Sequence, residues 1–290
     1  MKKDEALNIH ISNLREFDSR LEISEQQHTL TVSQISDILI LNRDGEDDHT
    51  LYRRFKSITN NASCSDLALF ALRLSEAASL QTSSQKGSTV RSEKNVAPGA
   101  HGKISMVQNE YCKSAYGILS KTVKNPKQIY CASFPEACET VVYNASEFAL
   151  LPIESTINGR LFGFYSMLDR YELKIYAVCT LETEGEKAAE AVRYALAGKG
   201  LPDRPQRNKR LNFEFSLISE NGCLPTEVIR VGEVLGAKIL KIDSLPVEYD
   251  NTQQKYYFTV EITEKLSLAL DLYLSEEYKG YTRIGKYTVI

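Results

Sequence analysis

The 290-residue chain lacks long apolar runs, basic patches and a signal-peptide core. None of its apolar stretches is long enough to span a bilayer, and its first residues are mainly charged. The net charge of −3 gives no electrostatic footprint for a nucleic acid or a membrane surface. We therefore expect a cytoplasmic protein that binds neither nucleic acid nor membrane.

The chain also lacks the residue pattern of a metal site. Its six cysteines include no C-x-x-C pair, and none of its four histidines is near a cysteine or another histidine. Reduced, partly buried thiols are the expected state in a cytosolic protein, and no base is evident for a catalytic cysteine. We predict no metal and no cofactor.

Residues 1–81 carry a helical pattern. Apolar residues recur at spacings of four and three from Leu7 to Leu39, interrupted by the polar residues Asp18, Glu25 and His28, which predicts a long helix with a heptad seam. Two shorter helices are predicted over residues 50–58 and 65–81. Three such helices cannot bury the seam alone, so we expect a homodimer or tetramer formed partly through this region. Residues 82–94, rich in Ser, Thr and Gln, form a predicted linker.

The middle part, residues 95–201, alternates strands and helices. A Gly-rich turn at 98–102 leads into a predicted helix at 106–115. Strands are predicted at 128–132, 148–153 and 173–181, with helices at 134–143, 161–171 and 186–197. Alternation at these lengths predicts an α/β layer with largely parallel strands.

Polar residues follow the strand at 148–153 without a break. Glu154, Ser155 and Thr156 come directly after Pro152 and Ile153, and Asn158 and Gly159 come next. Polar groups at the carboxyl end of a buried strand face the crevice where ligands bind in open α/β sheets. Hydroxyls ahead of a helix can also cap its N–H groups or leave them for an anion. The segment therefore predicts a small-anion site.

This stretch resembles the Pro-Ile-Glu-Asn-Ser signature of prephenate dehydratases, with Ser155 in the place of the Asn. Pro98-Gly99-Ala100-His101-Gly102 resembles the family's Pro-Gly-Ala-Tyr-Ser turn, and residues 133–141 and 167–175 resemble the segments on either side of the signature strand. The resemblance implies one periplasmic-binding-protein-like α/β lobe. It implies relict or partial catalytic residues at Glu154, Ser155 and Thr156, and substrate-binding residues at Gly99, Ala100, His101, Asn158 and Gly159.

The chain departs from this family in one large respect. Prephenate dehydratases work in a cleft between two lobes, and the residues needed for the second lobe and its Thr-Arg-Phe motif are missing here. Thr282-Arg283 is followed by Ile and lies in the next predicted domain. Glu154 has two open interpretations, since it could donate a proton or could cap a helix or pair with a base. Lys103 or Arg160 could hold a substrate carboxylate.

Residues 211–290 follow a linker at 202–210 and carry a βαββαβ pattern, which is ferredoxin-like. This part resembles an ACT domain, an amino-acid-sensing module that binds phenylalanine in such enzymes. The resemblance implies ligand-binding residues in two loops, namely Asn221, Gly222, Cys223, Leu224, Asp243 and Ser244. Asp243 would meet the ligand's ammonium group. Leu245 replaces an Arg of the family pattern, and serving only as a dimerisation module is an open alternative.

The helical region resembles a chorismate mutase domain over residues 14–21 and 72–81. Ile11, His28 and Leu39 stand where that family has its substrate-binding cations, so we expect no mutase activity. The order of the three parts is that of the bifunctional mutase–dehydratase of phenylalanine biosynthesis.

The resulting hypothesis is a multidomain α and α/β protein with a helical bundle, one α/β lobe and an ACT domain. It would bind an aromatic metabolite or L-phenylalanine as a regulatory or partner subunit, with a possible partner enzyme of aromatic amino acid synthesis. The alternative is an active prephenate dehydratase whose cleft is completed in an oligomer, and whether the chain is an enzyme is left open.

Overall fold

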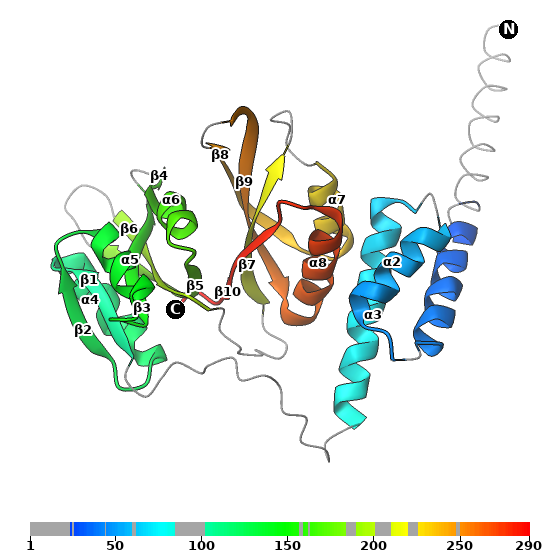
Figure 1. Ribbon diagram of the computed structural model, residues 1–290, viewed down its shortest axis with the longest axis horizontal. Coiled ribbons are helices and arrows are strands. Elements are labelled where there is room, and N and C mark those ends of the chain that lie inside the picture. Colours follow the sequence, from blue (N-terminus) through cyan, green and yellow to red (C-terminus); the bar gives the residue numbers. More distant parts are fainter. Residues whose placement is uncertain are drawn as a thin grey trace, which may run out of the picture.

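The computed structural model describes residues 24, 26–43, 45–59, 62–84, 102–156, 159–161, 163–183, 190–200, 210–219, 226–247 and 250–290. These fall into three parts that follow one another along the chain (Figure 1). We call them the helical region (26–84), the lobe (102–200) and the C-terminal unit (210–290). The helical region contains a helix over 26–41, α2 (Asp48–Thr59) and α3 (Cys64–Ser84).

The lobe is an α/β layer built on a central sheet. Its elements are β1 (Lys103–Val107), α4 (Glu110–Leu119), the 3-10 helix η1 (Ser120–Thr122), β2 (Lys127–Cys131), α5 (Phe134–Val142), β3 (Phe148–Ser155), β4 (Gly159–Arg160), α6 (Gly163–Arg170), β5 (Lys174–Thr183) and β6 (Glu190–Gly198). Strand β1 pairs in parallel with both β2 and β3. Residues of α5 and α6 pack in one core and residues of α4 in another. The predicted alternation of strands and helices is therefore present up to β5. The prediction of largely parallel strands was wrong, because β3 pairs antiparallel with β4 and β6, and β6 pairs antiparallel with β5.

Strand β6 replaces the helix predicted over 186–197, and that prediction was wrong. β6 lies between β3 and β5 and is antiparallel to both. Val192, Tyr194 and Leu196 enter one core, whereas Ala195 and Ala197 enter the other. This period of two marks a strand that is buried on both faces. The alanines, which are strong helix formers, masked that pattern in the sequence.

The helix predicted over 106–115 also begins too early. Met106 lies in β1 and is fully buried, because this strand is covered by helices and flanked by strands on both sides. Helix α4 begins only after Asn109, whose side chain accepts a hydrogen bond from the Cys112 amide at 2.7 Å. Asn at this position is a strong helix-start signal.

The C-terminal unit has the predicted βαββαβ order. Its elements are β7 (Arg210–Ser219), α7 (Thr226–Val234), β8 (Lys238–Val247), β9 (Asp250–Thr263), α8 (Glu264–Glu277) and β10 (Thr282–Tyr287). The strands run β10-β7-β9-β8, and each neighbouring pair is antiparallel. Phe213 and Phe215 of β7 share a core with α7 and α8, whereas Glu214 between them faces the lobe.

The lobe and the C-terminal unit share one ten-stranded sheet. Strand β10 pairs in parallel with β5 at Gly285 and Ile175, and antiparallel with β7 on its other side. A Cβ at Gly285 would lie 2.8 Å from the Cβ of Ile175, so glycine permits the two strands to approach. A bridge between Val178 and Val289 extends this pairing.

A buried polar network also connects the lobe with the C-terminal unit. The fully buried Glu214 accepts hydrogen bonds from the hydroxyl groups of Tyr165 on α6 and Tyr287 on β10, the latter at 2.5 Å. The ring of Tyr165 also stacks on Tyr257 of β9, with centroids 3.9 Å apart. Helix α6 therefore covers the face of the C-terminal sheet that faces away from α7 and α8.

The helical region packs on the other side of the C-terminal unit. Leu67, Phe70 and Leu74 of α3 are buried in the same core as Leu270 and Leu274 of α8. The apolar face of α3 thus finds its partner within the chain. The prediction of a homodimer or tetramer stays a prediction.

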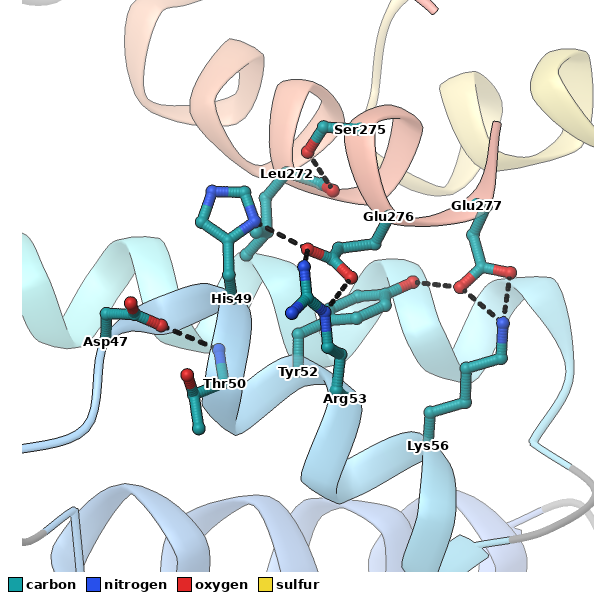
Figure 2. Close-up of polar contacts among 10 residues, drawn as sticks. All are labelled: Asp47, His49, Thr50, Tyr52, Arg53, Lys56, Leu272, Ser275, Glu276 and Glu277. Atoms are coloured by element: carbon teal, nitrogen blue, oxygen red, sulfur yellow. Dashed lines mark hydrogen bonds and ion pairs between the residues drawn. The ribbon is translucent and has the colours of Figure 1, made fainter. Parts of the chain in front are cut away.

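Ion pairs lie at the edge of the contact between the helical region and the C-terminal unit, where α2 approaches the end of α8 (Figure 2). Arg53 pairs with Glu276 at 2.7 Å and Lys56 with Glu277 at 2.7 Å, while His49 Nδ1 lies 2.7 Å from Glu276. Two adjacent carboxylates at a helix carboxyl end oppose the helix dipole, so the cations of α2 offset an unfavourable arrangement. We call these five residues the α2–α8 clamp.

Within the part of the chain described above, no helix is long and apolar enough to cross a membrane.

Candidate functional site

The predicted catalytic residues lie at the end of β3, in a hairpin. Glu154 pairs with Arg160 of β4 and Ser155 with Gly159, which has a positive φ of 66°. The Thr156 hydroxyl accepts a hydrogen bond from the amide of Ala191 in β6 at 3.0 Å. The interpretation of these hydroxyls as helix caps was therefore wrong, because the chain turns back as a strand at this point. Ser155 is buried.

Glu154 is held by two cations from distant parts of the sequence. Arg193 Nη1 on β6 lies 2.8 Å from its Oε1 atom, and Lys241 Nζ on β8 lies 2.9 Å from its Oε2 atom. Its side chain is only 18% exposed. Of the two interpretations left open by the sequence, pairing with a base is the one seen in the structure.

Lys241 connects this carboxylate with the predicted ligand-binding strand. Its Nζ atom is 3.8 Å from Oδ1 of Asp243, which lies two residues along β8. Glu154 and Asp243, predicted for separate sites in separate domains, thus belong to one group of charges at the border of the lobe and the C-terminal unit. We call Glu154, Arg193, Lys241 and Asp243 the Glu154 cluster.

The cluster balances its own charge. Two carboxylates face two cations, and each Glu154 oxygen is engaged by one of them. Lys241 remains 34% exposed, so the cluster is reached by solvent from the β8 side. Such an arrangement fixes the end of β3 against β8, and its cations are already engaged by carboxylates of the same chain.

The surroundings of Asp243 also serve packing. Leu245 packs against the core that the lobe shares with the C-terminal unit, whereas Ser244 is exposed. The apolar side chain of Leu245 suits this contact.

Several predicted site residues lie outside the described residues. These are Gly99, Ala100, His101, Asn158, Asn221, Gly222, Cys223 and Leu224. Their predicted roles stay predictions.

Arg193 and Lys241 were not predicted as site residues. Arg193 is the one cation in an otherwise apolar run of β6, and that run had been interpreted as a helix. Lys241 lies in β8, two residues before the predicted ligand-binding residue Asp243. A charged residue within a buried strand was the available signal, because such a group requires a partner.

The five cysteines that the structure describes form no disulfide bond with one another. Cys64, Cys112, Cys131, Cys138 and Cys179 are free thiols. Burial raises the pKa of Cys138 to about 12 and that of Cys179 to about 11, so both stay protonated and unreactive at neutral pH. Among the described residues, no three His, Cys, Asp or Glu side chains gather closely enough to hold a metal ion.

Comparison with known proteins adds information on the fold. No protein-family model matches the chain, and no curated protein matches it in sequence. One similar solved structure is GqqA, described as a novel type of quorum quenching acylase. It has a TM-score of 0.51 and 17% identity, over 64% of this chain and 94% of that one. At this identity the likeness shows a shared fold and nothing of the activity.

The structural neighbours also include prephenate dehydratases at TM-scores of about 0.5. The enzyme from Streptococcus mutans has a TM-score of 0.49 and 18% identity, over 65% of this chain and 98% of its own. The enzyme from Staphylococcus aureus has a TM-score of 0.48 and 8% identity, over 64% of this chain and 100% of its own.

Proposed function

We propose that this chain is a ligand-binding regulatory or partner subunit of aromatic amino acid biosynthesis, a reduced relative of the mutase–dehydratase family with impaired catalysis. The single observation that carries the proposal is the pairing of both Glu154 oxygens with cations of the same chain. The sequence motifs support the proposed relation to this family, and the Glu154 cluster supports the proposal that catalysis is impaired.

Dehydration of prephenate makes two demands on a site. A positioned acid must protonate the leaving hydroxyl group, which is typically worth about 10²–10⁴ in rate. Cations must also hold the two substrate carboxylates, at a few kcal/mol each. Here Arg193 and Lys241 are engaged with Glu154, so the residues that could meet these demands neutralise one another instead.

The ligand we propose is L-phenylalanine or a similar aromatic metabolite. The ACT-like resemblance places its ammonium group at Asp243, which is 23% exposed at its side chain and lies on the edge strand β8. Because Asp243 and Glu154 both contact Lys241, a ligand whose ammonium group pairs with Asp243 would also alter the ion pairs at the end of β3. This gives a physical route from ligand binding to the lobe.

The first test is incubation of the full-length protein with prephenate, followed by measurement of phenylpyruvate. We expect no turnover above the uncatalysed rate. Turnover that disappears in Glu154→Gln would overturn the proposal in favour of the alternative, an active dehydratase whose cleft is completed in an oligomer.

The second test is calorimetric titration with L-phenylalanine. We expect binding that is lost in Asp243→Ala and retained in Asp37→Ala, a matched control on the helical region whose side chain is 55% exposed. Absence of any binding to the unmodified chain would count against the sensor role.

A further inference from the structure

An open cleft of about 790 Å³ lies between the helical region and the C-terminal unit. Its walls come from the 43–49 segment, α3, α8 and the start of β10. The lining residues are Arg43, Asp47, Asp48, His49, Ala71, Ser75, Ala78, Leu268, Asp271, Leu272, Ser275, Tyr281 and Arg283. Figure 2 shows four of them, Asp47, His49, Leu272 and Ser275, where the start of α2 meets α8. The volume is in the range of small-molecule sites.

Arg283 of β10 lines the cleft beside Asp271 of α8. Arg283 Nη1 pairs with Asp271 at 2.8 Å, and its side chain remains 36% exposed. Its other guanidinium N–H groups meet no acceptor among the described residues, although a guanidinium carries five donors. Asp271 also accepts a hydrogen bond from the Tyr281 hydroxyl group. The carboxylate is therefore satisfied while the guanidinium is not.

Lys286 of β10 adds a partly buried cation near Arg283. Its side chain is 12% exposed, and its Nζ atom lies 3.9 Å from Glu264. Burial lowers the pKa of Lys286, the charges of Asp271 and Glu264 raise it, and the charge of Arg283 lowers it.

The floor of the cleft is apolar. Ala71 on α3 and Leu272 on α8 line it, together with Leu268, which is 46% exposed. Leu268 lies one turn before Leu272 on the same helix, so the two side chains form a continuous apolar surface. Covering such a surface is favourable by about 25 cal/mol per Å².

The wall at the start of α2 carries Asp47 and Asp48, together with Arg43 and His49. Asp48 pairs with Arg43 at 2.9 Å, whereas Asp47 accepts a hydrogen bond from the Thr50 amide at 2.7 Å. This backbone hydrogen bond lowers the pKa of Asp47, which is therefore ionised at neutral pH. A second anionic group on a ligand would be repelled here.

From these features we propose that the cleft binds a small amphipathic monocarboxylate, with its carboxylate on Arg283 and its apolar body on Leu268 and Leu272. This site is separate from the Asp243 strand, and it requires a carboxylate but no ammonium group. Dicarboxylates are disfavoured because of Asp47. The inference stands whether or not the chain senses phenylalanine.

The test uses three probes on the full-length protein, followed by saturation-transfer NMR and calorimetry. The probe 3-phenylpropionate carries one carboxylate, 3-phenylpropionamide is its neutral counterpart, and benzylsuccinate carries two carboxylates. We expect binding of the first, with affinity at least about tenfold weaker for each of the others. Equal binding of acid and amide, or no binding of the acid up to about 10 mM, would overturn the proposal.

Variants locate the binding site. Arg283→Met should weaken 3-phenylpropionate binding about tenfold or more, while Arg210→Met, at a 58% exposed arginine paired with Glu261, should leave it unchanged. Since Arg283→Met also removes the partner of Asp271, Leu268→Asp provides a second variant at an exposed position. Its matched control is Leu30→Asp, at a leucine that is 60% exposed on the helix over 26–41. Unchanged affinity in both cleft variants would place the binding elsewhere and contradict the proposal.

Discussion

The C-terminal unit is joined to its two neighbours by different kinds of contact. Toward the lobe, the junction consists of strand pairing at Gly285, the buried Glu214 network and the stacked rings of Tyr165 and Tyr257. Toward the helical region, it consists of an apolar core sealed by the exposed α2–α8 clamp. Directional hydrogen bonds fix the first junction, whereas side-chain burial holds the second. The open cleft lies at this second junction, between the C-terminal unit and the helical region.

The largest expected effect comes from breaking the apolar junction. Phe70→Ala removes a fully buried ring that stacks on Phe55 with centroids 4.1 Å apart. We expect a loss of about 3–5 kcal/mol in the free energy of unfolding, because a cavity remains between α2 and α3. Urea unfolding followed by circular dichroism measures it.

The control is Tyr143→Ala, at a ring that is 79% exposed on the lobe, where almost no change is expected. A loss below about 1 kcal/mol for Phe70→Ala would mean that α3 is not held as described.

A smaller effect is expected from the polar junction. Tyr287→Phe removes one of the two hydroxyl donors to the buried Glu214 carboxylate. Hydrogen bonds to charged groups contribute about 1.5–3 kcal/mol, so we expect a loss of that size in the free energy of unfolding. Tyr111→Phe, at a 43% exposed ring, serves as the control. Equal stability of both variants would show that Glu214 does not depend on Tyr287.

The smallest effect concerns the clamp and its response to acid. The hydrogen bond from Arg53 holds the pKa of Glu276 below its ordinary value. In the helical region, burial would raise the pKa of Asp66, but hydrogen bonds from His28 and Ser63 outweigh it, and the pKa of Asp66 is lowered. A carboxyl group with a lowered pKa in the folded state stabilises the fold above its unfolded pKa. That contribution is lost as the pH falls below about 4.

Glu276→Gln tests this response. The variant should be slightly less stable than the unmodified chain at pH 7, by less than either substitution above, and the difference should shrink progressively as the pH falls below about 4. Glu110→Gln, at a side chain that is 87% exposed, should show no such convergence. A difference that stays constant with pH would argue against a role for the ionised Glu276.

The sequence predicted most of the fold, because local signals agree with the final structure at most elements. The alternation over 211–218, and Ser133 and Pro135 at the start of α5, are examples. It failed at residues 186–197, where alanine propensity favours a helix but β3 and β5 leave a gap for a strand. Propensity is a weak prior, and the tertiary environment overrides it there.

The candidate site was predictable only in part. Glu154 stood out because it follows a buried strand. Its partners Arg193 and Lys241 lie 39 and 87 positions away, and no local pattern connects them. Their meeting depends on how β8 crosses the end of β3, which is a property of the assembled sheet.

The position of β10 in the sheet also bears on how the chain folds. Strand β10 lies between β5 and β7 in the sheet. It is synthesised about a hundred residues after β5, so β5 lacks this neighbour until then. Until then β5 presents an unpaired edge, which other chains can join. Contacts between such distant segments form slowly. The sheet of the lobe is therefore completed on this side only after β10 has been synthesised.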